Sequence, residues 1–222
     1  MLETLRSNYE GTAAPTALQS ASRLEDPFRV LIATVLSQRT RDEETEIAGD
    51  RLFETYHTAA DLARAGLADI EERISNVGFY RTKAKAVKSI AGIIVSDYDG
   101  HVPSDMESLL DLPMVGRKTA NCVLVYGFGR PAIPVDTHVH RIANRLGWVR
   151  TKTPEETETA LSSLLPEGSW LMLNELMVTH GKNICRPVSP MCGDCPVRNL
   201  CLHGSGHCMP HASAGAASGR RL

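Results

Sequence analysis

Four cysteines lie close together near the end of the chain with the spacing C-x6-C-x2-C-x5-C: Cys185, Cys192, Cys195 and Cys201. A segment this short cannot easily pair its cysteines as disulfides and still supply a fold. Clustered thiolates suit a metal group instead, either one tetrahedral Zn2+ ion or a cubane iron–sulfur cluster. We therefore expect this segment to fold around metal and the rest of the chain to form its scaffold.

The composition is that of an ordinary soluble protein, with 222 residues, 42% of them hydrophobic and 23% charged. This length allows one large domain or two small ones. No apolar run reaches membrane-spanning length, and residues 1–6 lack the basic start and apolar stretch of a signal peptide. We expect a cytoplasmic protein without a membrane partner. In the reducing cytosol, clustered cysteines indicate metal more often than disulfides.

Helix signals run along the chain, and no convincing strand alternation is present. Asp26 followed by Pro27 predicts the start of an apolar helix. Thr40 is expected to cap the next helix and Ser104 a short later one, and residues 81–96 have the apolar face of a long amphipathic helix. The pattern predicts an all-α fold of about ten helices.

The formal net charge of −2 at pH 7 gives no overall attraction to phosphate. Acidic residues concentrate in residues 42–46 and 155–158, however, which leaves a basic cluster elsewhere. By charge alone, a phosphate-binding face and a solvated helix face are equally good interpretations of this cluster. Its members are Arg73, Arg81, Lys83, Lys85, Lys88, Arg117, Lys118, Arg141 and Arg145.

A tight hairpin between two helices is predicted at about residues 104–128. The residues 112–116, Leu-Pro-Met-Val-Gly, must turn sharply, with Leu112 and Val115 anchored in the core. Gly116 has no side chain, so backbone amides at the start of the following helix can approach an anion such as a DNA phosphate. The alternative is a plain connection between two helices.

Two motifs at and after this hairpin carry a family resemblance. L-P-x-V-G-R-K-T-A-N, followed by V-D-T-H-V-x-R-x-x-N-R-L, resembles the helix-hairpin-helix, Gly-Pro-Asp DNA glycosylases, and in particular their endonuclease III branch. The four-cysteine spacing matches the [4Fe–4S] loop of that branch. Residues 36–38 and 78–84 also resemble family segments. One departure is Met114, which stands where a glycine is common.

The resemblance covers about residues 28–201 and implies a two-domain, all-α architecture. A six-helix domain with the hairpin would span residues 22–131. Residues 1–21 with 132–202 would form the iron–sulfur cluster domain. Residues 203–222 fall outside the resemblance and are rich in Gly, Ala, Ser and His, so we expect a disordered tail.

The resemblance implies a bifunctional DNA glycosylase and AP lyase of base excision repair, acting on oxidised pyrimidines in double-stranded DNA. The helix dipole and Arg117 favour the free amine of Lys118, which would attack C1′ of a flipped-out nucleotide and form a Schiff base. β-Elimination would then cut the strand 3′ to the abasic site. Asp136 would help deprotonate Lys118 and stabilise an oxocarbenium-like transition state. The plainer roles are a phosphate contact for Lys118 and a helix N-cap for Asp136.

Gln38 and Phe79 are the candidates to enter the duplex, because an amide can fill the gap left by a nucleotide and an aromatic ring can separate the stack. Either could instead pack in the core. The other predicted DNA contacts are Arg81, Val115, Gly116, Arg117, His138 and Arg141.

The four cysteines would hold a structural [4Fe–4S] cluster, with Zn2+ as the alternative. Cys122, expected to be buried, and Cys208 lie outside the cysteine pattern. Two other functions stay open: a thymine–guanine mismatch glycosylase of the same superfamily, and a noncatalytic DNA-binding or redox-sensing protein. We expect a monomer associated with the nucleoid.

Overall fold

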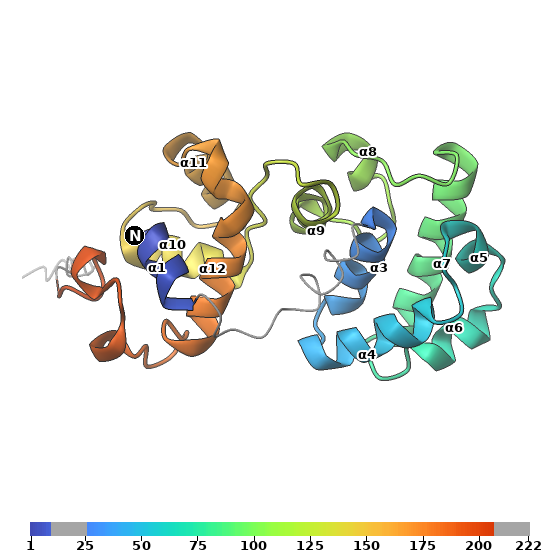
Figure 1. Cartoon of the computed structure of the whole chain (residues 1–222), viewed down its shortest axis with the longest axis horizontal. Coiled ribbons are helices and arrows are strands. Elements are labelled where there is room, and N and C mark those ends of the chain that lie inside the picture. Colours follow the sequence, from blue (N-terminus) through green and yellow to red (C-terminus); the bar gives the residue numbers. More distant parts are fainter. Residues whose placement is uncertain (10–25, 207–222) are drawn as a thin grey trace, which may run out of the picture.

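The structure is a computed structural model that describes residues 1–9 and 26–206. These residues form helices and turns without a strand, which confirms the predicted all-α class (Figure 1). None of the helices in the described ranges is long and apolar enough to cross a membrane. The predicted tail lies outside the described residues from position 207 onward, and Cys208 with it.

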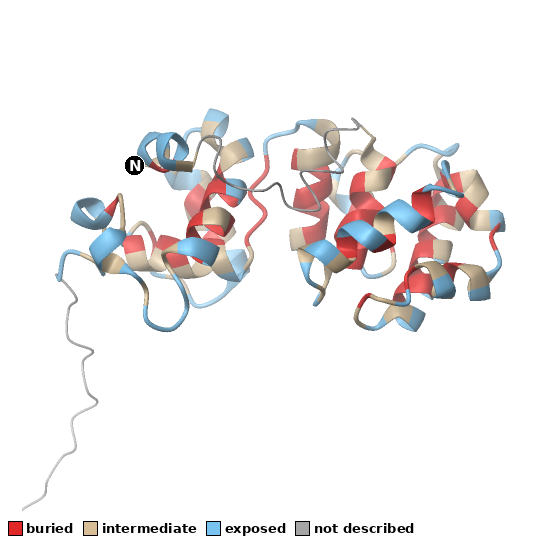
Figure 2. Cartoon of the chain, turned by 60° about the horizontal axis from the view of Figure 1, so that its bottom comes forward, coloured by how far each residue is buried: buried red, intermediate tan, exposed pale blue. Residues whose placement is uncertain are grey.

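The first group of helices surrounds an almost fully buried central helix, α3, which packs against α4, α7 and α9. Residues 28–132 supply its apolar core, and Figure 2 shows the buried positions running through the group. The helices of this group are α3 (Pro27–Ser37), α4 (Asp42–Phe53), α5 (Ala59–Arg64), α6 (Leu67–Arg73), α7 (Tyr80–Asp97), α8 (Met106–Leu110) and α9 (Arg117–Cys122).

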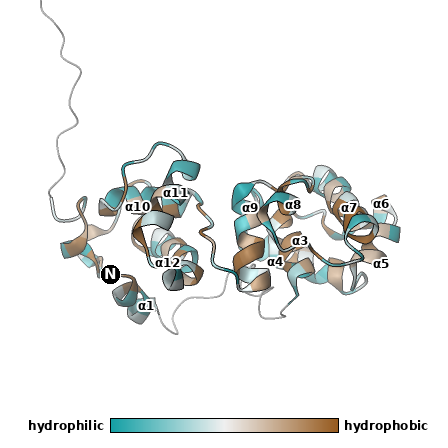
Figure 3. Cartoon of the chain, turned by 90° about the horizontal axis from the view of Figure 1, so that it is seen from above, coloured by the Kyte–Doolittle hydropathy of each residue, from teal (hydrophilic) through white to brown (hydrophobic). Residues whose placement is uncertain are grey.

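The second group of helices has its own apolar core, which begins at Ile133 and includes Leu5 from the start of the chain. The first helix of the chain packs on α12, so the N-terminal segment lies with the C-terminal third (Figure 1). An extended segment joins the two groups, as Figure 3 shows from above. The second group consists of α1 (Leu2–Tyr9), α10 (Thr137–Leu146), α11 (Pro154–Leu164) and α12 (Trp170–Asn183).

The helix starts follow the predicted caps in some places and depart from them in others. Asp26 accepts hydrogen bonds from the amides of residues 28 and 29, as predicted. Thr40 does not cap α4, which begins after Arg41 without a side-chain cap. Ser104 is not the cap of α8 either, because Asp105 accepts the hydrogen bond from the amide of Ser108. Each error displaces a helix start by one residue.

Candidate functional site

The predicted hairpin is formed by α8, a sharp turn and α9. Leu112 and Val115 are buried and anchor the turn in the first core, as predicted. Gly116 precedes α9 and is exposed, and a side chain built there would meet nothing within 4 Å. The amides at the start of α9 are therefore open to a ligand. Met114 adopts the left-handed conformation, with φ of 60°, in spite of its side chain.

Lys118 and Asp136 both act electrostatically on the same buried thiol, that of Cys122. Lys118 is half-buried in the first turn of α9 and contacts this thiol one turn further along. Burial raises the pKa of Cys122, while the Lys118 ammonium lowers it and the Asp136 carboxylate raises it. Asp136 caps α10, and its Oδ1 accepts hydrogen bonds from the amides of His138, at 2.8 Å, and Val139, at 2.9 Å. The amine and the carboxylate are thus close enough to act on one neighbour.

Buried amides hold the extended segment that carries Asp136. Asn121 Nδ2 donates to the Ile133 carbonyl at 3.3 Å, and Asn174 Nδ2 donates to the Pro134 carbonyl at 2.8 Å. The hydroxyl of Tyr126 donates to Asn174 Oδ1 at 2.9 Å. This network was not predicted from the sequence, although an asparagine within an apolar helical stretch such as 119–125 indicates a specific buried partner.

Two further turns meet the hairpin turn, and each of the three contains a non-glycine residue in the left-handed conformation. These residues are Arg39, Phe79 and Met114, with φ of 52°, 58° and 60°. Gln38 Nε2 donates to the Met114 carbonyl at 2.9 Å and to Thr119 Oγ1 at 3.4 Å, which joins the first turn to the hairpin. Strained backbone of this kind gathers at functional sites, where the surrounding structure must hold it in place.

The three turns line an open pocket of about 360 Å³. Phe79 is 64% exposed, so the alternative of core packing is wrong for this residue. The guanidinium of Arg39 lies 5.9 Å from the centroid of the Phe79 ring, and Arg39 is exposed as well. The sequence analysis did not single out Arg39, whose only signal was its place directly after Gln38. The residues that line the pocket are Gln38, Arg39, Phe79, Thr82, Lys83 and Met114.

Several cations of the predicted basic cluster are already engaged. Arg117 forms a bidentate ion pair with Glu158, at 2.8 and 2.9 Å, and Arg73 pairs with Asp69 at 2.8 Å. The acidic segment 155–158 therefore faces the basic cluster, whereas Asp42 of the other acidic segment pairs with Lys182, outside the cluster. Lys83 is buried and belongs to no basic surface. Arg81 is exposed and lies over the ring of Tyr80.

His138 and Arg141 lie between α10 and the cysteine segment. Arg141 donates to the Cys185 carbonyl through Nε, at 3.2 Å, and Nη2, at 2.9 Å. Its Nη2 also lies 3.1 Å from Nδ1 of His138. A Cβ on Gly181 would lie 2.2 Å from that nitrogen, so α12 needs a glycine to pass this close to α10. The geometry gives both side chains a part in seating the cysteine segment.

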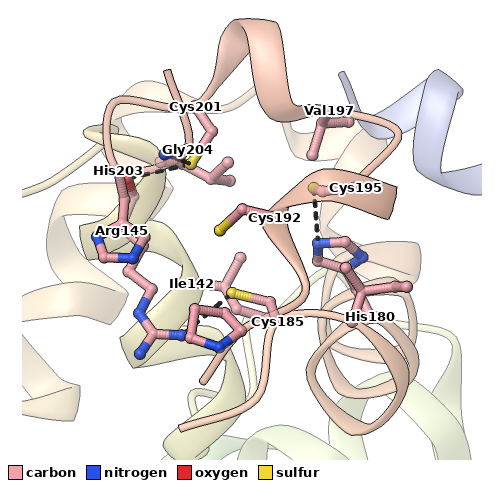
Figure 4. A pocket seen from close by; sticks show the side chains of 13 residues that line it. Ile142, Arg145, His180, Cys185, Cys192, Cys195, Val197, Cys201, His203 and Gly204 are labelled. Carbon is pink, nitrogen blue, oxygen red and sulfur yellow. Dashed lines mark hydrogen bonds between the residues drawn. The ribbon is translucent and has the colours of Figure 1, made fainter. Parts of the chain in front are cut away.

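The four cysteine side chains line one cavity between α10, α12 and the last described residues (Figure 4). The Arg145 guanidinium donates to Cys185 Sγ and the Gly204 amide donates to Cys201 Sγ, both at 3.4 Å. Apolar side chains complete the lining, among them Ile142, Leu146 and Val197. Four thiols in a largely apolar cavity, two of them with donors directed at their sulfurs, fit a metal–thiolate group. In the described residues, no three Cys, His, Asp or Glu side chains meet as ligands of a single ion.

Comparison with known proteins gives matches along most of the chain. Residues 32–167 match the family described as HhH-GPD superfamily base excision DNA repair protein. The chain is 57% identical to endonuclease III of Thermotoga maritima over 176 residues, which are 79% of this chain and 83% of the relative. It is 40% identical to endonuclease III of Synechocystis over 202 residues, or 90% of both chains.

Two solved structures extend this likeness to the fold. One is a trapped endonuclease III–DNA covalent intermediate, which matches with 34% identity and a TM-score of 0.80 over 93% of this chain and 94% of the other. The second is a thermostable thymine-DNA glycosylase, with 25% identity and a TM-score of 0.81 over 92% and 94%. Both agree with the resemblance that the hairpin and cysteine motifs indicate.

Proposed function

Because the chain belongs to the endonuclease III family within the HhH-GPD superfamily of base excision DNA repair proteins, we propose that Lys118 and Asp136 carry out its reaction. The protein is a DNA glycosylase and AP lyase of base excision repair. The observation that supports the two roles is that the Lys118 amine, directly after the hairpin, and the Asp136 carboxylate, at the start of α10, both act on the Cys122 thiol. Phosphate binding by the hairpin amides would need neither group.

In the glycosylase step, the free amine of Lys118 forms a bond to C1′ while the bond from C1′ to the damaged base breaks. Asp136 takes a proton from the amine and stabilises positive charge that develops on the sugar. Both amides that cap α10 bind Oδ1 of Asp136, so the second oxygen, Oδ2, is the one we assign to the reaction.

In the lyase step, opening of the sugar ring converts the lysine adduct into a protonated Schiff base. This iminium withdraws electrons from C2′, so that loss of a C2′ proton expels the phosphate on the 3′ side. The strand is cut, and water then releases Lys118. The lysine must lose its proton to begin the cycle, and Asp136 is the group to which we assign this proton transfer.

The target nucleotide must leave the stack before Lys118 can reach C1′. The exposed stack of Arg39 and Phe79 supports a revised assignment of the groups that enter the duplex. Phe79 keeps its predicted role of separating bases. Arg39, in place of Gln38, is assigned the role of filling the gap that the nucleotide leaves in the stack. Gln38 braces the hairpin instead, because its amide is bound to Met114 and Thr119.

The exposed Gly116 at the start of α9 is the phosphate contact that we propose for the hairpin. Val115, also predicted as a DNA contact, is buried, and its amide donates to the Leu112 carbonyl at 3.1 Å. Arg117 can join Gly116 only if its ion pair with Glu158 opens.

His138 and Arg141 were predicted as DNA contacts. We assign them instead to holding the cysteine segment, because Arg141 donates to the Cys185 carbonyl and contacts His138.

For the cysteine cavity we propose a [4Fe–4S] cluster, with Zn2+ as the alternative. The spacing of Cys185, Cys192, Cys195 and Cys201 and the sulfur-directed donors of Arg145 and Gly204 support it. When bound, the cluster supplies metal–thiolate bonds that order the segment, and the lysine chemistry does not require it.

Oxidised pyrimidines are the substrates that we propose, on the strength of the endonuclease III relatives. Excision of thymine from mismatches with guanine is the second candidate. The structural likeness to a thymine-DNA glycosylase, with a TM-score of 0.81, is the observation that favours this second candidate.

Borohydride trapping tests the proposal directly, because it reduces a lysine Schiff base to a stable crosslink. We expect the wild-type protein to crosslink to duplexes with an abasic site or with thymine glycol, and Lys118→Ala to crosslink to neither. Lys85→Ala removes an exposed lysine and is the control. Crosslinking by Lys118→Ala would overturn the assignment of the nucleophile. Crosslinking of the wild type to the abasic site alone would redirect the substrate test to mismatches.

A further inference from the structure

Lys83 is a buried cation with no part in the chemistry described above. Its side chain is 1% exposed, and its ammonium donates to three uncharged oxygens. These are the carbonyl oxygens of Leu36 and Gln38, each at 2.6 Å, and Thr40 Oγ1, at 2.8 Å. Removing a charge from water is costly, and buried charges are ordinarily kept where a specific arrangement of partners depends on them.

The three acceptors surround one turn. The Leu36 carbonyl belongs to the last turn of α3, where a cation stabilises unpaired carbonyls. The oxygens of Gln38 and Thr40 lie on either side of Arg39, the residue with the left-handed conformation. An ammonium has three N–H donors, one for each oxygen, whereas a neutral amine has only two. The charged form therefore matches this turn.

The same contacts continue to the partner of Arg39. Thr40 Oγ1 also accepts a hydrogen bond from the amide of Gly78, at 3.2 Å. A Cβ on Gly78 would lie 3.0 Å from the Arg39 carbonyl, so the turns 38–40 and 78–79 are in direct backbone contact. Phe79 follows at once, and Lys83 itself lies one turn later in α7. The ammonium is thus connected to both members of the exposed Arg39–Phe79 stack.

We propose that Lys83 is a positioning residue for base extrusion, whose ammonium holds the turn 38–40 in the shape that presents Arg39 against Phe79. The inference rests on the proposed function, because it assumes that this stack enters the duplex. A methionine would fill the same space without the cost of burying charge, but it would leave the three oxygens without their donor. Burial lowers the pKa of Lys83 only to about 8, so the ammonium persists at neutral pH.

Lys83→Met is the decisive variant, and Lys88→Met is its matched control. Lys88 lies on the same helix and also donates to a backbone carbonyl, that of Ala65, away from the pocket. Each protein is assayed in single turnover on thymine glycol in a duplex and on an abasic site in single-stranded DNA, which needs no extrusion. We expect Lys83→Met to lose about a hundredfold on the duplex, as misplacement of about 1 Å can cause, and less than about threefold on the single strand.

A spectroscopic measurement separates positioning from general damage. A 2-aminopurine beside the lesion brightens when it is unstacked, and this rise should be present with the wild type and Lys88→Met and absent with Lys83→Met. Lys83→Gln, whose amide supplies two donors, should restore part of the duplex activity and serves in place of Lys83→Met if that variant does not fold. Equal losses on both DNAs, or no loss on the duplex, would overturn the proposal.

The single-stranded arm also distinguishes failure of this inference from failure of the proposed function. If wild-type protein forms no borohydride-trapped adduct with the single-stranded abasic site, the lysine mechanism fails, whatever Lys83 does. If the adduct forms and Lys83→Met behaves like Lys88→Met, the mechanism stands and the inference about Lys83 is wrong.

Discussion

The two groups of helices differ in how their cores are completed. Aliphatic and aromatic side chains from α3 to α9 fill the first core. The second core is smaller, and against it pack three of the four clustered cysteines, Cys185, Cys195 and Cys201. The described residues from 184 to 206 form turns and two three-residue 3-10 helices. Apolar burial can maintain the first group, whereas we propose that the second also depends on the metal group that its thiols bind.

The reaction that we propose needs both groups, because Lys118 lies on α9 of the first and Asp136 begins α10 of the second. Buried bonds to the joining segment and two ion pairs, Arg117–Glu158 and Lys182–Asp42, connect the groups. A defect in either core should therefore reach the chemistry, but by different routes.

The largest expected effect is that of Cys192→Ser, which removes one of the four thiols that we propose as cluster ligands. Losing a structural metal group costs on the order of 10 kcal/mol of binding free energy, so the segment 184–206 should lose its order. Hydrogen exchange should increase in this segment and in α12, while α3 and α7 keep their protection. Cys122→Ala is the control, because it changes a cysteine of the first group that lies outside the proposed ligands. This variant should keep the visible absorption of the cluster. Equal exchange in all helices of Cys192→Ser would show that the two cores unfold as one.

The second prediction concerns Asp136→Asn, which separates the two roles of this residue. Asparagine caps a helix about as well as aspartate, so the melting temperature should barely change. The substitution removes both the general base and the negative charge, so the rate of single-turnover excision should fall about 10²–10⁴-fold. Asp26→Asn is the matched control, since Asp26 caps α3 with the same two-amide pattern. Comparable activity of both variants would leave Asp136 only its role as a cap.

The sequence predicted local features well and long-range ones poorly. The starts at Asp26 and Asp136 depend on neighbouring amides, so the local pattern was sufficient. Lys83 looked like a surface cation, because its three acceptors lie more than 40 residues earlier and become neighbours only when α7 packs on α3. The pair between Arg117 and Glu158 spans 41 residues and escaped notice for the same reason.

The third prediction uses the buried charge of the first group. Burial lowers the pKa of Lys83 from 10.5 to about 8, so the unfolded chain binds more protons between these values. The contribution of Lys83 to stability therefore rises with pH from about 8 to 10.5, by at most about 1.4 kcal/mol per pH unit. Lys83→Met lacks this contribution. Denaturant unfolding should show that the free energy of unfolding of the wild type, relative to that of Lys83→Met, increases with pH across this range. A difference that stays constant with pH would contradict the lowered pKa of Lys83.

The smallest expected effect is that of Glu158→Gln, which breaks an ion pair between the two groups. The Arg117 side chain in this pair is 49% exposed, so stability should fall by only about 0.2–1 kcal/mol. Arg117 becomes free to bind phosphate, and DNA affinity should rise, with a salt dependence steeper by about one charge. Glu155→Gln removes the same charge from the same helix and leaves the pair intact. If both variants tighten binding equally, net charge explains the gain. A gain confined to Glu158→Gln would show that this contact between the groups holds Arg117 back from DNA.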